Sequence, residues 1–175
     1  NNEVPGEAYL IVGTDGPMPY NFMPDAKSGI AGLWGRFTGD YWSFSGFEEI
    51  EKVHLVLEEA SQGSIKLEVT YEQSSNEMYL LEGDGNGWLG PCTPGELGTL
   101  SNGIVELDCR GSAVISADET LRVLWRIRWD PGLSEPMDFN VFMRAISPSD
   151  VDTGYKQFGD WMLNGLKMFI PFLKK

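Results

Sequence analysis

Acidic side chains are the most abundant groups in this sequence that could take part in acid–base chemistry. They occur in three short clusters, which are Glu48, Glu49 and Glu51; Glu58 and Glu59; and Asp150 and Asp152. Two carboxylates that face each other across a sugar cleft are the working pair of a glycosidase. A chain with a formal net charge of −13 carries most of its carboxylates on solvated surface. We therefore keep a small hydrolase only as the third alternative for function.

Histidine, the usual general base, occurs once, as His54. It falls on the polar side of an alternating segment and has no neighbouring Ser, Cys, Asp or second His in the sequence. Such a residue is typical of an exposed surface rather than of a catalytic site. The chain contains no GxSxG, HExxH or P-loop motif. The sequence therefore predicts a protein that is not an enzyme, without catalytic residues.

Aromatic rings near turns are the candidates for ligand binding, because exposed Trp and Tyr rings stack on sugars. The four residues that meet this description are Trp34, Tyr41, Trp42 and Trp88. Trp125 and Trp129 lie instead on the apolar side of a strand, which predicts that they belong to the core. A carbohydrate-binding module with a glycan as its partner is therefore the second alternative for function.

Calcium is the one cofactor that the sequence leaves open. The stretch from Asp84 to Gly87, DGNG, is similar to the start of a calcium loop, but the alternating third ligand and the bidentate Glu at the twelfth position are missing. We expect a tight turn there and no metal site in general, with calcium at Asp84, Asp150 or Asp152 as the alternative.

The two cysteines, Cys92 and Cys109, enclose a loop rich in Gly and Pro. An even cysteine count in such a chain predicts a disulfide, which would stabilise the fold by about 3 kcal/mol in the chain-entropy model. Disulfides persist outside the cytosol, so we expect an extracellular or cell-surface protein, with two free thiols in a cytosolic protein as the alternative. The net charge of −13 makes nucleic acid an unsuitable partner. No apolar run is long enough for a membrane-spanning helix.

The segment Thr120 to Trp129, TLRVLWRIRW, gives the fold class. Its apolar residues alternate with three arginines, which is the pattern of a half-buried strand. The same alternation in residues 52–58 and 64–71 predicts an antiparallel hairpin. We expect an all-β protein, a single antiparallel β-sandwich of eight to ten strands with an immunoglobulin-like or jelly-roll-like form. The predicted core residues are Leu121, Val123, Trp125, Ile127, Val53, Leu55, Leu57, Ile65, Leu67 and Val69.

Glycine and proline predict where the chain is irregular. Residues 14–29 hold three prolines and are expected to form a long loop, and residues 83–102 the longest irregular segment. Thr38-Gly39-Asp40 is expected to be the turn of an aromatic hairpin. Residues 1–7 are expected to be a polar arm and 164–175 an apolar tail, so that 1–175 form one domain with two extensions.

Two segments carry a family resemblance. MYLLEGDGNGWLGPCTPGELGTLSNGIVELDC is similar to the middle, and VLWRIRWDPGLSEPMDFNVFMRAISPSDVDTGYKQFGDW to the end, of an immunoglobulin-like β-sandwich module that recurs in large exported bacterial proteins. The resemblance covers about residues 52–162. The chain departs from the pattern at Tyr155, where a Trp is usual, and at Asp160, where a Thr is usual. The resemblance implies an extracellular structural or adhesive unit.

These observations together predict a non-catalytic extracellular structural or adhesive protein that assembles with copies of itself or with neighbouring surface modules, as a surface or filament subunit. Self-assembly is expected to use the apolar tail, because its burial would contribute several kcal/mol at about 25 cal/mol per Å². The residues expected to form this contact are Leu166, Met168, Phe169, Ile170, Phe172 and Leu173. An intramolecular strap is the alternative.

Overall fold

The computed structural model describes residues 16–165, which form thirteen strands and one short 3₁₀ helix. The elements are β1 (Met18–Pro24), β2 (Ser28–Ile30), β3 (Trp34–Trp42), η1 (Phe47–Glu49), β4 (Lys52–Glu59), β5 (Ile65–Glu72), β6 (Glu77–Leu81), β7 (Trp88–Cys92), β8 (Thr99–Ser101), β9 (Val105–Asp108), β10 (Ala113–Ala117), β11 (Thr120–Trp129), β12 (Met137–Ile146) and β13 (Lys156–Asn164). The predicted number of eight to ten strands is wrong, because several segments that were expected to be irregular are strands. The predicted arm and tail contacts lie outside the described residues.

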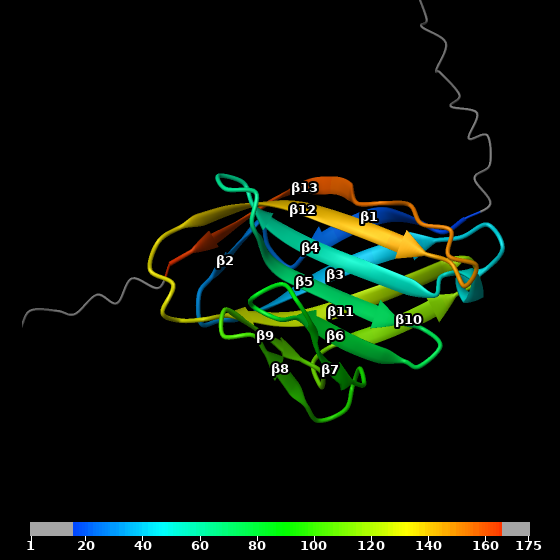
Figure 1. Ribbon diagram of the computed structural model, residues 1–175, viewed down its shortest axis with the longest axis horizontal. Coiled ribbons are helices and arrows are strands. Elements are labelled where there is room, and N and C mark those ends of the chain that lie inside the picture. Colours follow the sequence, from blue (N-terminus) through cyan, green and yellow to red (C-terminus); the bar gives the residue numbers. More distant parts are fainter. Residues whose placement is uncertain (1–15, 166–175) are drawn as a thin grey trace, which may run out of the picture.

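Two sheets pack face to face, which confirms the predicted β-sandwich (Figure 1). One sheet has the order β1-β3-β11-β9-β8, with β10 also paired to β11, and the other has the order β2-β13-β12-β4-β5-β6-β7. Neighbouring strands are antiparallel except β2 and β13, which run parallel. The seven-stranded sheet is the one that positions the candidate site.

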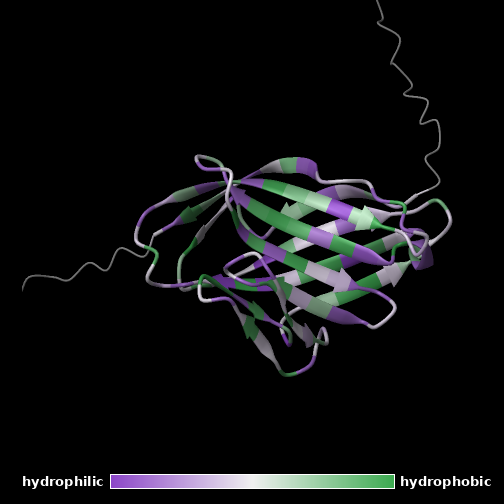
Figure 2. Cartoon of the chain, viewed as in Figure 1, coloured by the Kyte–Doolittle hydropathy of each residue, from purple (hydrophilic) through white to green (hydrophobic). Residues whose placement is uncertain are grey.

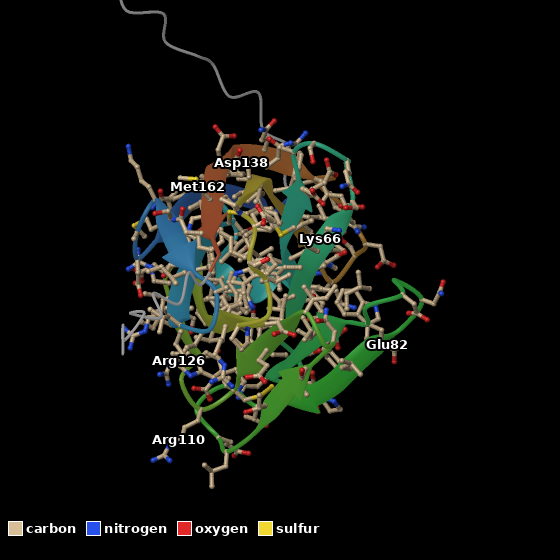
Figure 3. The ribbon with its side chains drawn as sticks, turned by 90° about the vertical axis from the view of Figure 1, so that its left-hand side faces the viewer. Lys66, Glu82, Arg110, Arg126, Asp138 and Met162 are labelled. Atoms are coloured by element: carbon tan, nitrogen blue, oxygen red, sulfur yellow. A yellow bond between two sulfur atoms is a disulfide. The ribbon has the colours of Figure 1, made fainter. Side chains whose placement is uncertain are left out.

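Strand β11 lies at the centre of the first sheet and has the bounds that its alternation predicts. It pairs with β3 along one edge, while β10 and β9 share the other edge. Side chains from both sheets fill the space between them (Figure 3). Nine of the ten predicted core residues are buried, and Ile65 is the exception, with 47% of its surface exposed. The pairing of β4 with β5 shifts register between Leu57 and Glu58, and Ile65, the first residue of β5, therefore lies beyond the core.

Alternating hydropathy continues along the strands of both sheets (Figure 2). On the outer face of β11 each of the three arginines binds a carboxylate. This is expected in a chain that has twice as many acidic as basic residues. Arg122 donates to Asp40, Arg126 donates to Asp108 at 2.7 Å, and Arg128 donates to Glu106. Asp40 is buried, and the hydrogen bonds from Arg122 and Asn21 outweigh the effect of burial, so its pKa is lowered.

The predicted turn at residues 38–40 is wrong, because β3 passes straight through it. Gly39 is needed for space rather than for a turn. A Cβ there would lie 2.8 Å from Cε of Met143 and 3.1 Å from the ring of Trp125. A Cβ here would displace the end of the Met143 side chain and press on Tyr41 and Trp125, so glycine leaves room for the side chains packed between the two sheets.

The predicted loop at residues 14–29 is also wrong for the described part of that range. It contains β1 and β2, although β1 includes Pro19 and Pro24. Strand β1 lies at an edge of its sheet and has an irregular register between Pro19 and Asn21. Proline is tolerated at an edge because the missing N–H has no partner strand to serve. The segment 83–102 likewise contains β7 and β8.

The predicted disulfide between Cys92 and Cys109 is confirmed. It joins the end of β7 in one sheet to the residue after β9 in the other. Bonds of this kind persist in oxidising surroundings. No helix among residues 16–165 is long and apolar enough to cross a membrane.

Candidate functional site

The outer face of the seven-stranded sheet carries a row of polar side chains that crosses four adjacent strands. Arg144 of β12 is paired in register with His54 of β4, His54 with Thr70 of β5, and Thr70 with Tyr79 of β6. Side chains of directly paired residues project on the same face of a sheet about 5 Å apart. Their strand neighbours, such as Val53, point into the core. Inward and outward side chains alternate along these strands, so the burial of the inward ones places the polar row on the outer face.

His54 is the chemically distinctive member of the row. Only 5% of its surface is exposed, so the expectation of an exposed surface histidine is wrong. Its Nδ1 lies 2.9 Å from Oε1 of Glu68, which stands on the same outer face of β5. Glu68 is buried as well. Sequence reasoning missed this pair, although the predicted hairpin already placed both residues on its polar face.

Glu68 is ionised at neutral pH. Burial raises its pKa, but hydrogen bonds from His54 and from the hydroxyl of Tyr155 outweigh that effect and lower the pKa from its ordinary value. The Tyr155 hydroxyl donates to the same Oε1 at 2.7 Å. Burial and this bond raise the pKa of Tyr155 to about 12, so it remains a neutral phenol. Since the carboxylate only accepts, the Nδ1 of His54 must carry a proton.

The second ring nitrogen of His54, Nε2, is buried and has no hydrogen-bond partner within residues 16–165. In the neutral ring this nitrogen holds the lone pair, because Nδ1 carries the proton. Buried polar atoms are nearly always paired, so an unpaired one requires an explanation. A carboxylate that fixes one ring nitrogen as a donor and leaves the other as an acceptor is the arrangement that prepares a histidine as general base.

Arg144 places a permanent positive charge beside His54. Its Nε and Nη2 donate to the two carboxylate oxygens of Asp152 at 2.8 and 2.6 Å. These bonds raise the pKa of Arg144 and lower that of Asp152. The guanidinium also lies 5.2 Å from the ring centroid of Tyr155. Arg144 therefore fixes the segment 152–155 over the row.

An open pocket of about 570 Å³ lies over this row. The residues that line it are Lys52, His54, Glu68, Thr70, Glu72, Tyr79, Trp88, Arg144, Ile146 and Tyr155. Its volume falls within the range of small-molecule sites. The ring centroids of Trp88 and Tyr155 lie 6.1 and 6.2 Å from that of His54, and 42% and 44% of these residues are exposed. Two half-exposed aromatic rings therefore flank the buried histidine.

The predicted aromatic platform does not form as a unit. Tyr41 is fully buried and donates to the carbonyl of His54 at 2.9 Å, so its assignment to an exposed platform is wrong. Trp34 lines a different pocket, of about 230 Å³, and lies under the guanidinium groups of two arginines. Trp42, at the end of β3 in the first sheet, has its ring 6.2 Å from that of Phe44. Only Trp88 lines the pocket beside His54.

Two of the three aspartates considered for calcium have other partners. Asp84 accepts from the backbone N–H of Asn86 in its own turn, and Asp152 is bound by Arg144. Asp150 occupies a turn with φ of 60°. Residues 16–165 contain no group of three or more His, Cys, Asp and Glu side chains placed to hold a metal ion.

Known proteins give little further guidance. No family model matches the chain, and no curated protein matches it. The resemblance to an immunoglobulin-like surface module therefore stays a prediction. The chain is similar to the solved structure of AvmM, which is described as catalysing macrocyclization in alchivemycin A biosynthesis. The similarity covers 89% of this chain and 93% of AvmM, with 13% sequence identity and a TM-score of 0.44.

AvmM is described as catalysing a reaction, so this finding runs against the predictions of a non-catalytic protein and of a structural, adhesive or filament subunit, and both are withdrawn as corrections. At this TM-score the similarity brings neither the reaction nor the residues of AvmM to this chain. The pocket and the histidine in its wall are therefore the features that bear on function.

Proposed function

We propose that the protein is an enzyme that binds a small organic molecule in the pocket over β4, β5, β6 and β12 and removes a proton from it with Nε2 of His54. The observation that carries the proposal is the unpaired Nε2 of a histidine whose Nδ1 is held by a buried carboxylate. Glu68 would fix the tautomer and stabilise the imidazolium that forms.

Proton transfer suits the pocket better than nucleophilic chemistry. The described residues that line it include neither serine nor cysteine. The hydroxyl of Thr70 already donates to the carbonyl of Val53 at 3.0 Å and so is not poised beside His54 as a nucleophile. General acid–base catalysis by one positioned side chain typically contributes 10² to 10⁴-fold.

Access to Nε2 depends on the two flanking rings. Nε2 has no contact with solvent, so a substrate reaches it only after Trp88 or Tyr155 rotates away. Both residues are almost half exposed, but the hydroxyl of Tyr155 is bonded to Glu68, so Trp88 is the ring that we expect to move. The disulfide supports an oxidising compartment outside the cytosol as the place of action.

Two experiments test the proposal on protein freed of any histidine tag. Diethylpyrocarbonate carbethoxylates an accessible, unprotonated imidazole nitrogen and also reacts with amines, so peptide mass spectrometry should locate one of its adducts at His54, the only histidine of the chain. The second uses 5-nitrobenzisoxazole, from which a base removes the C3 proton while the N–O bond breaks to release a coloured phenolate. The intact protein should accelerate this release, and His54→Gln should reduce it to the buffer rate. Equal rates for the two proteins would refute His54 as the base.

A further inference from the structure

We infer that the substrate is a carbon acid whose C–H lies next to a carbonyl group, and that Arg144 binds the carbonyl oxygen while His54 takes the proton. This inference rests on the proposed function, since it names the substrate class for the same base. The observation that motivates it is the pairing of Arg144 with His54 in register on adjacent strands, which places a cation beside the base on one pocket wall.

The hydrogen bonds of Arg144 leave one side of its guanidinium free for a ligand. Asp152 takes Nε and Nη2, and Tyr155 lies close enough to raise the pKa of Arg144 further, but no aligned hydrogen bond within residues 16–165 uses Nη1. The side chain is 26% exposed, so it is neither buried nor freely solvated. Bidentate bonding to Asp152 and the ring of Tyr155 hold the guanidinium plane fixed. A fixed donor at a pocket wall is what stabilises an oxyanion as it forms.

The other charged groups of the pocket are already paired. Lys52, two residues before His54 on β4, forms an ion pair with Glu72 of β5. Glu68 accepts hydrogen bonds from His54 and Tyr155. Lys52 keeps further N–H donors, but it is paired in register with Ile146 and Glu72, whereas Arg144 is the lining cation that is paired in register with His54 itself. The rings of Trp88 and Tyr155 offer apolar surface to the rest of the substrate, which favours an aromatic or conjugated carbonyl compound.

The step balances without a co-reactant. Nε2 of His54 forms an N–H bond with the proton on the α-carbon, and the C–H electron pair becomes the C=C bond of an enolate. The carbonyl π electrons move onto oxygen, which accepts a hydrogen bond from Nη1 of Arg144. The imidazolium then returns its proton to carbon, or to oxygen to give the enol. In deuterated water the returned proton is a deuteron.

Phenylpyruvate is the probe, because its benzylic C–H lies next to a ketone and its phenyl ring matches the aromatic walls. Loss of the benzylic proton signal in deuterated buffer, followed by NMR, measures exchange. The intact protein should exchange it well above the buffer rate, and His54→Gln should not. Arg144→Gln should lower kcat at least tenfold with a smaller change in KM, because the oxyanion forms only in the transition state. Arg144→Lys should recover part of the loss by restoring the charge.

Controls separate this role from a structural one. Asp152→Asn keeps the guanidinium but weakens its hold on the segment 152–155, so a loss equal to that of Arg144→Gln would mean that Arg144 acts only by holding that segment. Such a result overturns the inference, as does a loss confined to KM. Release from 5-nitrobenzisoxazole without exchange of phenylpyruvate would overturn the substrate class and leave the base in place. Failure with both probes would overturn the proposed function itself.

Discussion

Replacement of Glu68 by Gln tests the histidine–carboxylate pair through protein stability, independently of any substrate. Oε1 of Glu68 accepts from both His54 and Tyr155, and no hydrogen bond in the described part of the chain uses Oε2. The oxygen of Gln can therefore keep both bonds while its NH₂ group takes the position of Oε2. The substitution removes the negative charge and changes little else.

The expected loss follows from the strength of these two bonds. A hydrogen bond to a charged group contributes roughly 1.5–3 kcal/mol and a neutral one roughly 0.5–1.5 kcal/mol. The neutral Gln side chain is also less costly to bury than the carboxylate, which offsets part of the difference. We expect Glu68→Gln to lower the free energy of unfolding by about 1–2 kcal/mol near pH 6.

The loss should depend on pH with a definite sign. The folded-state pKa of Glu68 is lowered from its ordinary value of 4.5. A lowered pKa means that the stabilisation is fully present above 4.5 and is lost as the pH falls through the folded-state value. The difference between the intact protein and Glu68→Gln should therefore be largest near pH 6 and should shrink steadily below about pH 4.5.

Urea denaturation followed by tryptophan fluorescence measures both quantities, at about pH 6, 4.5 and 3. Glu72→Gln is the matched control, since Glu72 stands on the same face of β5 but is paired with Lys52 near the surface. Its loss should be at most about 1 kcal/mol. A difference for Glu68→Gln that stays constant with pH, or an absence of any loss near pH 6, would refute the reasoning.

Three further predictions concern the packing and cover of the sandwich. Gly39→Ala should lower the free energy of unfolding, measured by thermal denaturation, by about 1–3 kcal/mol through overpacking. Gly35→Ala on the same strand is the control: its added Cβ meets no heavy atom within 4 Å, so the change should be neutral or stabilising. Replacement of both cysteines by serine should lower the urea midpoint by the equivalent of about 3 kcal/mol, the value for a loop of this length. Trp88→Ala should raise the rate at which diethylpyrocarbonate modifies His54, and an unchanged rate would mean that Trp88 does not limit access.

The parts of the fold that sequence predicted are those whose cause is local. The alternation in residues 120–129 gives both the bounds of β11 and its buried face, because a strand side chain alternates whatever its partners are. The turn assigned to Gly39 shows the limit of this reasoning. Gly favours turns, but it also fits where two elements approach closely, and only the position of Trp125 on another strand decides between these causes.

The candidate site was only half visible in the sequence. The hairpin of β4 and β5 was predicted correctly, and its polar face holds His54, Glu68 and Thr70 together. Their proximity was therefore available as a signal. Their burial was not, because the residues that flank them, Trp88 and Tyr155, come from β7 and from the segment before β13. A polar strand face is predicted to be exposed to solvent whenever the residues that cover it lie far away in the sequence.

The same arrangement explains how the site can open without loss of the fold. The core lies between the sheets and includes the inward neighbours of the row, such as Val53 and Val69. The cover lies on the opposite face, and neither Trp88 nor Tyr155 belongs to the core cluster. Rotation of Trp88 therefore breaks few buried contacts, whereas displacement of a core strand would cost a large part of the total stability. A base on the outer face of a rigid sheet is thus held in place by the core and shielded in part by a ring, Trp88, that can move.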